Sequence, residues 1–337
     1  MNEHYTFSGE AEPFEKLTLT EDEVSTIAKL GLAPEDLSQL LGGEHFAEGS
    51  YALLFELPDS DARLVAKVWK NPKHDSDRAR NENVALRLLR VRDFKNAPKS
   101  KGYLESTKIL FEEKIEGAPV EQFDKNVIER LAVALANLHS IKLNKYGKPL
   151  TKRKEGTRMD YLHDGVETLR KLALSFADQT DTIALVNRSL DRMEDQAREA
   201  GDAFLDKNFT LIHFDLNKGN ILYSKKEGDL VIVDWEQASA GDNAMDIAKL
   251  FLKSDFDSNQ KQEFLAQYEG HLWEKDSHLQ ERLQVYEPFV LANSILWRLG
   301  VLKNTPQQTS SENEKQFYNQ VKINLDKELE TLKESLA

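Results

Sequence analysis

The side chains best suited to chemistry lie within residues 209–237. Asp215 and Asn220 are five residues apart between strand-like stretches, and Asp234 follows the apolar run 230–233. Phosphoryl transfer uses one carboxylate to orient the attacking hydroxyl group, and it uses oxygen ligands to hold magnesium. Any one of these residues alone could simply form a turn. Their order favours a site with Asp215 beside the hydroxyl and with Asn220 and Asp234 on Mg²⁺.

A further candidate is Lys67, which lies in the alternating, strand-like segment 63–70. A lysine among apolar residues needs a partner, because an unpaired buried charge is costly. Glu82, in the helical pattern of residues 76–92, is the candidate partner, although a lysine that reaches solvent would need none. Such a pair holds the nucleotide's phosphates in kinases, so Lys67 and Glu82 are predicted to bind nucleotide.

Two segments also resemble a known family. Residues 213–222, HFDLNKGNIL, resemble the catalytic loop of the aminoglycoside phosphotransferase and choline kinase group, whose pattern is close to HGDLHPGNIL. Residues 233–250, VDWEQASAGDNAMDIAKL, resemble that group's IDW…GD…D-L-A segment. The resemblance is clear over residues 209–251, weaker over 45–140 and loose in the C-terminal third.

The resemblance implies a role for each matching residue. Asp215 would be the catalytic base, and Asn220 and Asp234 would be the magnesium ligands. His213 would orient the catalytic loop, and Asp246 would support that loop from a helix. Mg²⁺ would be the cofactor and ATP the co-substrate, with GTP as another possible donor. The acceptor would be a hydroxyl of an aminoglycoside-, choline- or homoserine-like small molecule.

The loop that covers the phosphates departs from the protein-kinase pattern G-x-G-x-x-G. The chain has Gly49 and Ser50 there, whose backbone amides and hydroxyl could cap phosphates, although a plain hairpin turn is an equal alternative. Glu113 and Ile115 fall where a strand-like segment ends, before Gly117 and its turn chemistry. We predict that these four residues, 49, 50, 113 and 115, contact the nucleotide.

The elements around these residues predict an α+β, two-lobed, protein-kinase-like fold. Residues 1–116 would form the N-terminal lobe, with an acidic helical extension at about 1–41 followed by a small antiparallel sheet and a helix. Residues 117–337 would form the larger, mostly helical C-terminal lobe, with the catalytic loop and the acceptor site. Residues 142–158 are loop-like and basic, and a solvated loop is favoured there over contact of residues 152–158 with an anionic substrate. Trp297, in an apolar run, suggests core packing more than contact with a ligand.

Composition excludes several classes of protein. The formal net charge is −13, and residues 1–62 hold 14 acidic and 2 basic side chains, so a basic nucleic-acid-binding face is not expected. The chain has no cysteine and no apolar run long enough to span a membrane. The polar, acidic N-terminus does not resemble a secretory signal. A cytoplasmic protein is expected, and the oligomeric state is left open.

Two alternatives to a small-molecule kinase remain. A protein Ser/Thr kinase normally carries HRD and DFG, whereas this chain has Phe214 in place of the arginine and Trp235 after the metal-site aspartate. Nine residues separate Glu236 from Asp246, which is short for an activation segment. A nucleotide-binding pseudokinase that acts as a scaffold is the other alternative, although such proteins usually lose a catalytic residue, and the candidates are all present here.

Overall fold

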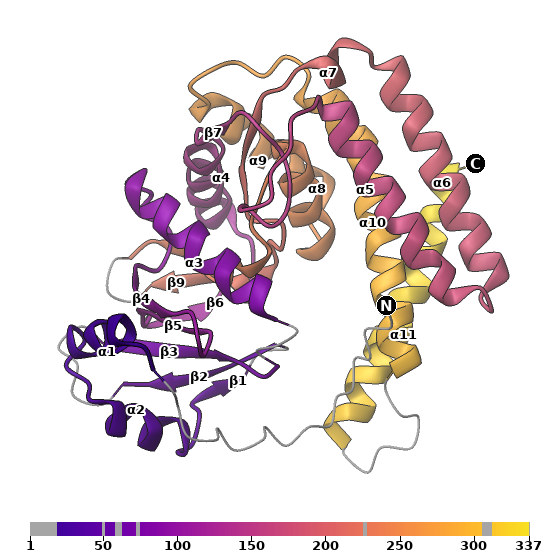
Figure 1. Ribbon diagram of the computed structural model, residues 1–337. Coiled ribbons are helices and arrows are strands. Elements are labelled where there is room, and N and C mark those ends of the chain that lie inside the picture. The colour runs from indigo at the N-terminus through magenta and orange to yellow at the C-terminus, as the bar shows by residue number, and fades with distance from the viewer. Residues whose placement is uncertain are drawn as a thin grey trace.

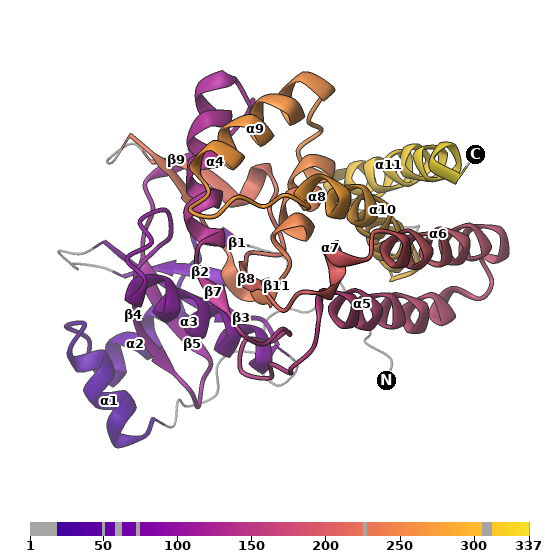
Figure 2. The same ribbon diagram turned by 90° about the horizontal axis from the view of Figure 1, so that it is seen from above.

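The computed structural model describes residues 19–48, 51–57, 63–71, 75–224, 228–304 and 312–336. Figures 1 and 2 show a β-rich part at one end and long helices at the other. The sheet comes first in the sequence and the helices follow, which is the α+β order predicted from the sequence. No helix of the described residues is long and apolar enough to cross a membrane.

The N-terminal sheet has five antiparallel strands in the order β1-β2-β3-β5-β4. The strands are β1 (Ala47–Glu48), β2 (Ala52–Glu56), β3 (Leu64–Trp69), β4 (Ser100–Leu104) and β5 (Ile109–Glu113). The central strand β3 is buried along its whole length. Because side chains alternate across a strand, Ala66 and Val68 face one hydrophobic cluster while Trp69 faces another.

Helices cover both faces of this sheet. On one face lie α1 (Glu21–Ala28) and α2 (Pro34–Leu41), which bury Ile27 and Leu37 against the sheet. On the other lies α3 (Ser76–Val91), which buries Leu86. Thr20 and Glu23 form a capping box at the start of α1, because they exchange hydrogen bonds there. Of the predicted extension 1–41, residues 1–18 lie outside the described part.

The remaining chain is mostly helical. Its helices are α4 (Lys125–His139), α5 (Arg158–Ala173), α6 (Thr180–Glu199), α7 (Asp202–Leu205), α8 (Asn243–Lys253), α9 (Ser258–His271), α10 (Leu279–Asn304) and α11 (Glu312–Leu336). Figure 2 shows α5, α6, α10 and α11 together on the side away from α1 and α2. A single large hydrophobic cluster runs through this region and continues under α3.

Two small sheets lie between the five-stranded sheet and the helices. One joins β6 (Gly117–Pro119), β9 (Ile221–Ser224) and β10 (Leu230–Ile232), and the other joins β7 (Lys142–Leu143), β8 (Phe209–Ile212) and β11 (Ser239–Gly241). Short 3₁₀ turns at 174–176, 218–220 and 235–237 complete the structure. The predicted catalytic loop therefore connects β8 to β9. The predicted lobe boundary at residue 117 stays a prediction.

Two expectations about single residues are wrong. Arg158 is not in a solvated loop: it is 5% exposed, begins α5 and forms ion pairs with Asp206 and with Asp242 at 3.2 Å. These carboxylates lie 48 and 84 positions further along the chain, so no local pattern reveals them. Trp297 is not a core residue, because its side chain is 43% exposed on α10.

Candidate active site

The loop after β8 is fixed to the first turn of α8. The buried carboxylate of Asp246 accepts hydrogen bonds from the backbone amides of His213, at 2.8 Å, and Phe214, at 2.6 Å. Phe214 has a φ of 65°, an uncommon backbone conformation for a large side chain. Burial works against ionisation of Asp246, but hydrogen bonding and charge from His139 hold its pKa below the ordinary value. Two backbone hydrogen bonds to Asp246 are thus the means by which it would support the loop, as predicted.

His139 is part of this support, which sequence reasoning did not foresee. Its Nε2 lies 3.3 Å from Asp246 Oδ2, and its Nδ1 lies 2.8 Å from the hydroxyl of Tyr268 on α9. The residue is fully buried near the end of α4. Its two partners lie 107 and 129 residues away in the sequence, so no local pattern reveals this role.

His213 connects the two predicted catalytic segments. The backbone amide of Asp215 donates to His213 Nδ1 at 3.2 Å, so the neutral ring carries its proton on Nε2. Nε2 then donates to the carbonyl of Val233 at 2.9 Å, immediately before Asp234. This one imidazole fixes the distance between the loop that holds Asp215 and the turn that holds Asp234.

Asn220 closes the loop from its other end. Its amide nitrogen donates to the Asp215 carbonyl at 2.9 Å and approaches the Asp215 carboxylate at 3.4 Å. The amide oxygen is therefore the Asn220 atom that can coordinate a cation. The backbone of Asn220 also accepts a hydrogen bond from Val233 at 2.9 Å, so Asn220 and Asp234 belong to adjacent segments.

Lys67 lies at the centre of the second half of the site. Its ammonium group is 2.7 Å from Glu82 Oε2 and 2.6 Å from Asp234 Oδ1. Glu82 also accepts a hydrogen bond from the Trp235 amide at 3.0 Å, which holds α3 against the turn after β10. Asp234 has a φ of 67°. The structure thus brings together Lys67, Glu82 and Asp234, three of the residues that the sequence predicted for the nucleotide and its metal.

Carboxylates outnumber cations around Lys67. Glu112 on β5 and Glu236 are also buried, and both act on Lys67 together with Asp234 and Glu82. Burial alone would lower the pKa of Lys67, but these four carboxylates hold it well above the ordinary value. Burial also raises the pKa of Glu82 to about 8 and that of Glu112 to about 7. The charge balance here favours an added cation.

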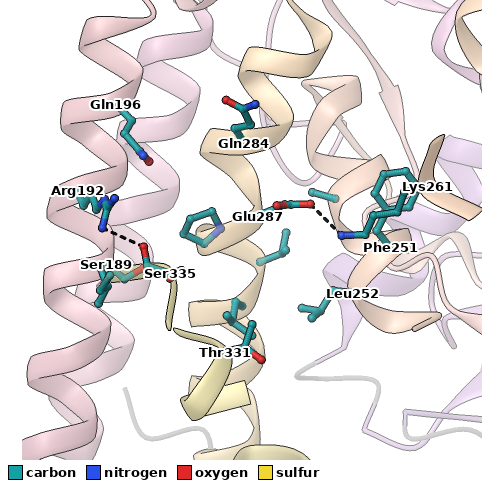
Figure 3. Close-up of a pocket in the computed structure, with 15 residues that line it drawn as sticks. Ser189, Arg192, Gln196, Phe251, Leu252, Lys261, Gln284, Glu287, Thr331 and Ser335 are labelled. Carbon is teal, nitrogen blue, oxygen red and sulfur yellow. Dashed lines mark hydrogen bonds and ion pairs between the residues drawn. The ribbon is translucent and has the colours of Figure 1, made fainter. Parts of the chain in front are cut away.

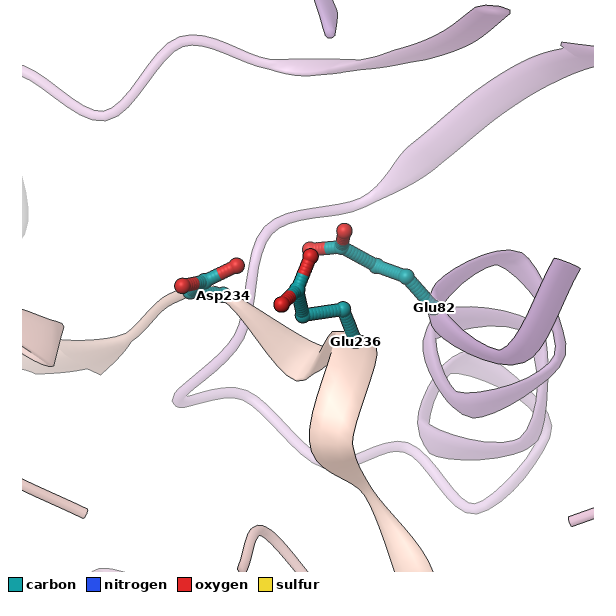
Figure 4. Close-up of side chains that lie close together, drawn as sticks. All are labelled: Glu82, Asp234 and Glu236. Atoms are coloured by element: carbon teal, nitrogen blue, oxygen red, sulfur yellow. The ribbon is translucent and has the colours of Figure 1, made fainter. Parts of the chain in front are cut away.

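The carboxylates of this group differ in how readily they can bind a cation. Ligand atoms of Glu82, Asp234 and Glu236 lie within 4.8 Å of one another (Figure 4). Glu236 is already bound by Arg78 at 2.9 Å and by the Trp69 ring nitrogen at 3.2 Å. Asp234 is different, because its side chain is 38% exposed. Oxygen donors from Asp234 and Asn220, beside surplus negative charge, fit the preferences of Mg²⁺.

The other predicted nucleotide residues are less well defined. Gly49 and Ser50, which fall between β1 and β2 in the sequence, lie outside the described residues. Glu113 ends β5, where its amide donates to Lys99, and Ile115 is half-buried in the segment that follows. Neither side chain has a contact that assigns it a role, so these residues remain predictions.

A separate cavity of about 290 Å³ lies in the helical region, between α6, α8, α10 and α11 (Figure 3). Figure 3 shows Lys261 paired with Glu287 and Arg192 bonded to Ser335 at its edges. None of the residues predicted for the base, the metal or the nucleotide lines it. The catalytic candidates therefore form a site of their own.

Solved structures share this fold. The choline kinase LicA from Streptococcus pneumoniae is 19% identical, with a TM-score of 0.55 over 83% of this chain and 91% of its own. Aminoglycoside phosphotransferase APH(4)-Ia is 14% identical, with a TM-score of 0.60 over 93% and 99% of the two chains. Spectinomycin phosphotransferase APH(9)-Ia, in complex with ADP and spectinomycin, is 13% identical, with a TM-score of 0.52 over 87% and 91%.

These likenesses confirm the predicted kinase-like fold. No curated protein sequence matches the chain at a significant level. The family model for the phosphotransferase enzyme family, by contrast, matches residues 43–279, a span that runs from the five-stranded sheet to the start of α10 and contains the whole candidate site. The chain therefore belongs to the phosphotransferase enzyme family.

Proposed function

We propose that this phosphotransferase is an ATP- and magnesium-dependent kinase that phosphorylates a hydroxyl group of a small molecule. The observation that carries the proposal is the convergence of Lys67, Glu82 and Asp234 beside the loop of Asp215 and Asn220. These residues supply a phosphate-binding cation, metal-binding oxygens and a separate carboxylate for the acceptor, which are the groups that phosphoryl transfer requires.

In the proposed reaction, each residue has a limited task. Asp215 orients the acceptor hydroxyl and receives its proton as the new oxygen–phosphorus bond forms. The bond between the β- and γ-phosphates breaks, and ADP leaves. Lys67, held by Glu82, binds phosphate oxygens of the nucleotide. Asp234 and the amide oxygen of Asn220 would hold Mg²⁺, which neutralises charge on the phosphates when it is bound.

The segment after Asp234 favours a small acceptor over a protein. Residues 238–246 are buried without exception, and β11 (Ser239–Gly241) pairs with β8 inside the molecule. A peptide substrate needs an accessible activation segment in that position, and here the chain enters α8 directly. This observation makes the protein-kinase alternative the weaker one.

Retention of Lys67, Asp215, Asn220 and Asp234 argues against the pseudokinase alternative. The test is a thermal-shift titration with ATP and Mg²⁺, followed by a screen of small alcohols for ADP release. Stabilisation that needs both ATP and Mg²⁺, together with acceptor-dependent ADP release that Asp215→Asn removes, is the expected result. Stabilisation without any release across a broad acceptor screen would favour the pseudokinase.

A further inference from the structure

A group of lysines with no role in the proposed reaction lies near the loop that holds Asp215. Lys249 on α8 donates from Nζ to the carbonyl of Phe214 at 2.8 Å, one residue before Asp215. Its ammonium group lies 3.7 Å from the centre of the Phe214 ring, and Lys148 Nζ lies 5.5 Å from the same ring. Lys253, one turn further along α8, donates to Ser294 on α10 at 3.1 Å. We name Lys148, Lys249 and Lys253 the lysine cluster.

The lysine cluster lacks protein counter-ions. Among the residues that the structure describes, no carboxylate lies within 4.0 Å of any of its three ammonium groups. Lys249 is 7% exposed, so its charge is largely removed from water. An unpaired buried cation is costly, and it persists where function requires it. A negatively charged ligand can therefore act as the counter-ion of these lysines.

The cluster faces the reacting position. Asp215 is among the charges that act on all three lysines, which places each of them near the proposed catalytic base. Burial lowers the pKa of Lys249 to about 8 and that of Lys148 to about 8. Lys148 is nonetheless open to solvent and contacts Gln237.

The surroundings do not cancel this positive charge. The nearest additional carboxylate on α11, Glu328, already binds Arg298 through two contacts of 2.9 Å and accepts from Ser294 at 2.9 Å. The exposed ring of Trp297 lies 5.4 Å from Lys253 Nζ and extends the same surface. The carboxylates that act on the three lysines are Asp215, Asp246, Glu236 and Glu328. Two of them already have an arginine as partner, Glu236 with Arg78 and Glu328 with Arg298.

We propose that the acceptor carries an acidic group, a carboxylate or a phosphate, in addition to the hydroxyl that is phosphorylated, and that Lys249 and Lys253 bind this group. Lys148 completes the positive side of the acceptor site near Asp215, and Trp297 covers the carbon skeleton of the acceptor. The proposal rests on the proposed small-molecule kinase function. It selects hydroxy acids and sugar phosphates over choline-like and aminoglycoside-like acceptors, which are cations.

The first arm of the test compares matched acceptors. ADP release is measured with glycerate against glycerol, gluconate against sorbitol, and sugar phosphates against the free sugars, with choline and kanamycin as cationic probes. At least one acidic member should exceed its neutral partner about tenfold in kcat/KM, the size of one charge-assisted contact. Turnover of choline or kanamycin without turnover of any acid would overturn the inference and leave the kinase function standing.

The second arm needs no knowledge of the acceptor. Sulfate or phosphate is titrated into enzyme saturated with Mg²⁺ and ADP, and binding is followed as the change in intrinsic fluorescence that Trp297→Phe removes, in a Trp273→Phe background, since Trp273 is the other exposed tryptophan of the described residues. Saturable binding is expected in the parent protein and in Lys261→Gln, a control that removes a lysine already paired with Glu287. Lys253→Gln should weaken anion binding about tenfold, and Lys253→Arg should restore most of it.

The two arms also separate the possible failures. If sulfate binds no better to the parent than to Lys253→Gln, the lysine cluster is not an anion site. If Lys253→Gln raises KM for ATP rather than for the acidic acceptor, these lysines serve the nucleotide and the inference is wrong. If Mg²⁺ and ATP fail to bind at all, the kinase proposal itself fails. Because Lys253 is only half-buried, its variants should fold, unlike changes at buried Lys249.

Discussion

Two buried lysines of this site have opposite electrostatic surroundings. Lys67 lies between Glu82 and Asp234, with Glu112 and Glu236 nearby, and its pKa is raised well above the ordinary value. Lys249 has a backbone carbonyl for a partner, and burial lowers its pKa to about 8. Burial opposes the charge of both lysines, so the neighbouring carboxylates make the difference. The proposed nucleotide side therefore places its lysine in direct contact with carboxylates, whereas the lysine on the proposed acceptor side contacts a carbonyl.

The largest effect should come from the residue between these two sides. Asp215→Asn should lower kcat by about 10² to 10⁴, because a general base contributes that much, while ATP affinity stays nearly unchanged. Asp234→Asn should weaken binding of the metal–nucleotide complex as well as turnover, since its carboxylate contacts Lys67 and would contact Mg²⁺. Steady-state kinetics measure kcat, and nucleotide titrations measure the affinity for the metal–nucleotide complex. Near-normal turnover in Asp215→Asn would show that the catalytic loop has been assigned wrongly.

The next effect is on the nucleotide side alone. Lys67→Met should reduce kcat/KM for ATP by about 10² or more, comparable to losing one preorganised donor, and should leave sulfate binding at the lysine cluster intact. Lys70→Met is the matched control, because Lys70 is the exposed lysine next to β3 and pairs with Glu48. Equal losses in both variants would show that the effect is not specific to the site.

Lys67→Met should also change how stability depends on pH. Burial already raises the pKa of Glu82 to about 8, and Lys67 opposes that rise. A carboxyl group whose pKa is higher in the folded state contributes stability that is present at low pH and is lost as pH rises through the folded pKa. The melting temperature of Lys67→Met should therefore fall below that of the parent by more at pH 8.5 than at pH 6. A pH-independent difference would contradict this.

A smaller effect should appear on the acceptor side as pH rises. Lys249 and Lys148 have pKa values of about 8, so sulfate affinity measured with saturating Mg²⁺ and ADP should decline severalfold between pH 7 and pH 9. The carboxylates of Asp215 and Asp246 and the ammonium of Lys253 also act on Lys249. Stability should rise from about pH 8 upward, because the unfolded chain then holds more protons than the folded one. Constant sulfate affinity would contradict the assignment.

The smallest effect should come from the acidic N-terminal part. Neutralising the exposed carboxylates of Glu21, Asp22 and Glu35 should leave KM for the acceptor within about twofold and cost a few tenths of a kcal/mol through the helix dipoles of α1 and α2. Glu23 is excluded from this set, because it is buried and accepts from the Ser106 amide at 2.7 Å. A large rise in acceptor KM would show that the overall acidity, rather than the lysine cluster, governs the acceptor.

The pairing of Lys67 with Glu82 could be predicted because a charged residue in an apolar strand demands a partner on the next helix. The same reasoning applies to Lys249, which stands in the apolar segment of α8, but its partner is a carbonyl 35 residues away and its role depends on Lys148 and Lys253. The spacing of these lysines in the sequence does not reveal that they lie near one another in the fold. The order of strands and helices was predictable from periodicity, whereas the burial of Arg158 and the exposure of Trp297 depend on how distant helices pack.

The hydrogen bonds and the ion pair between α3 and the turn after Asp234 affect how the protein folds during its synthesis. Asn81 donates to the carbonyls of Glu236 and Ala238, Arg78 binds the Glu236 carboxylate, and Glu82 binds the Trp235 amide. During synthesis from the ribosome, α3 emerges more than 150 residues before these partners. Until residues 235–238 have been synthesised, the polar side chains of α3 lack these hydrogen-bond partners. The first 116 residues should therefore not fold to a stable unit alone. The N-terminal part and the candidate site then become complete only after residues 235–238 have been synthesised.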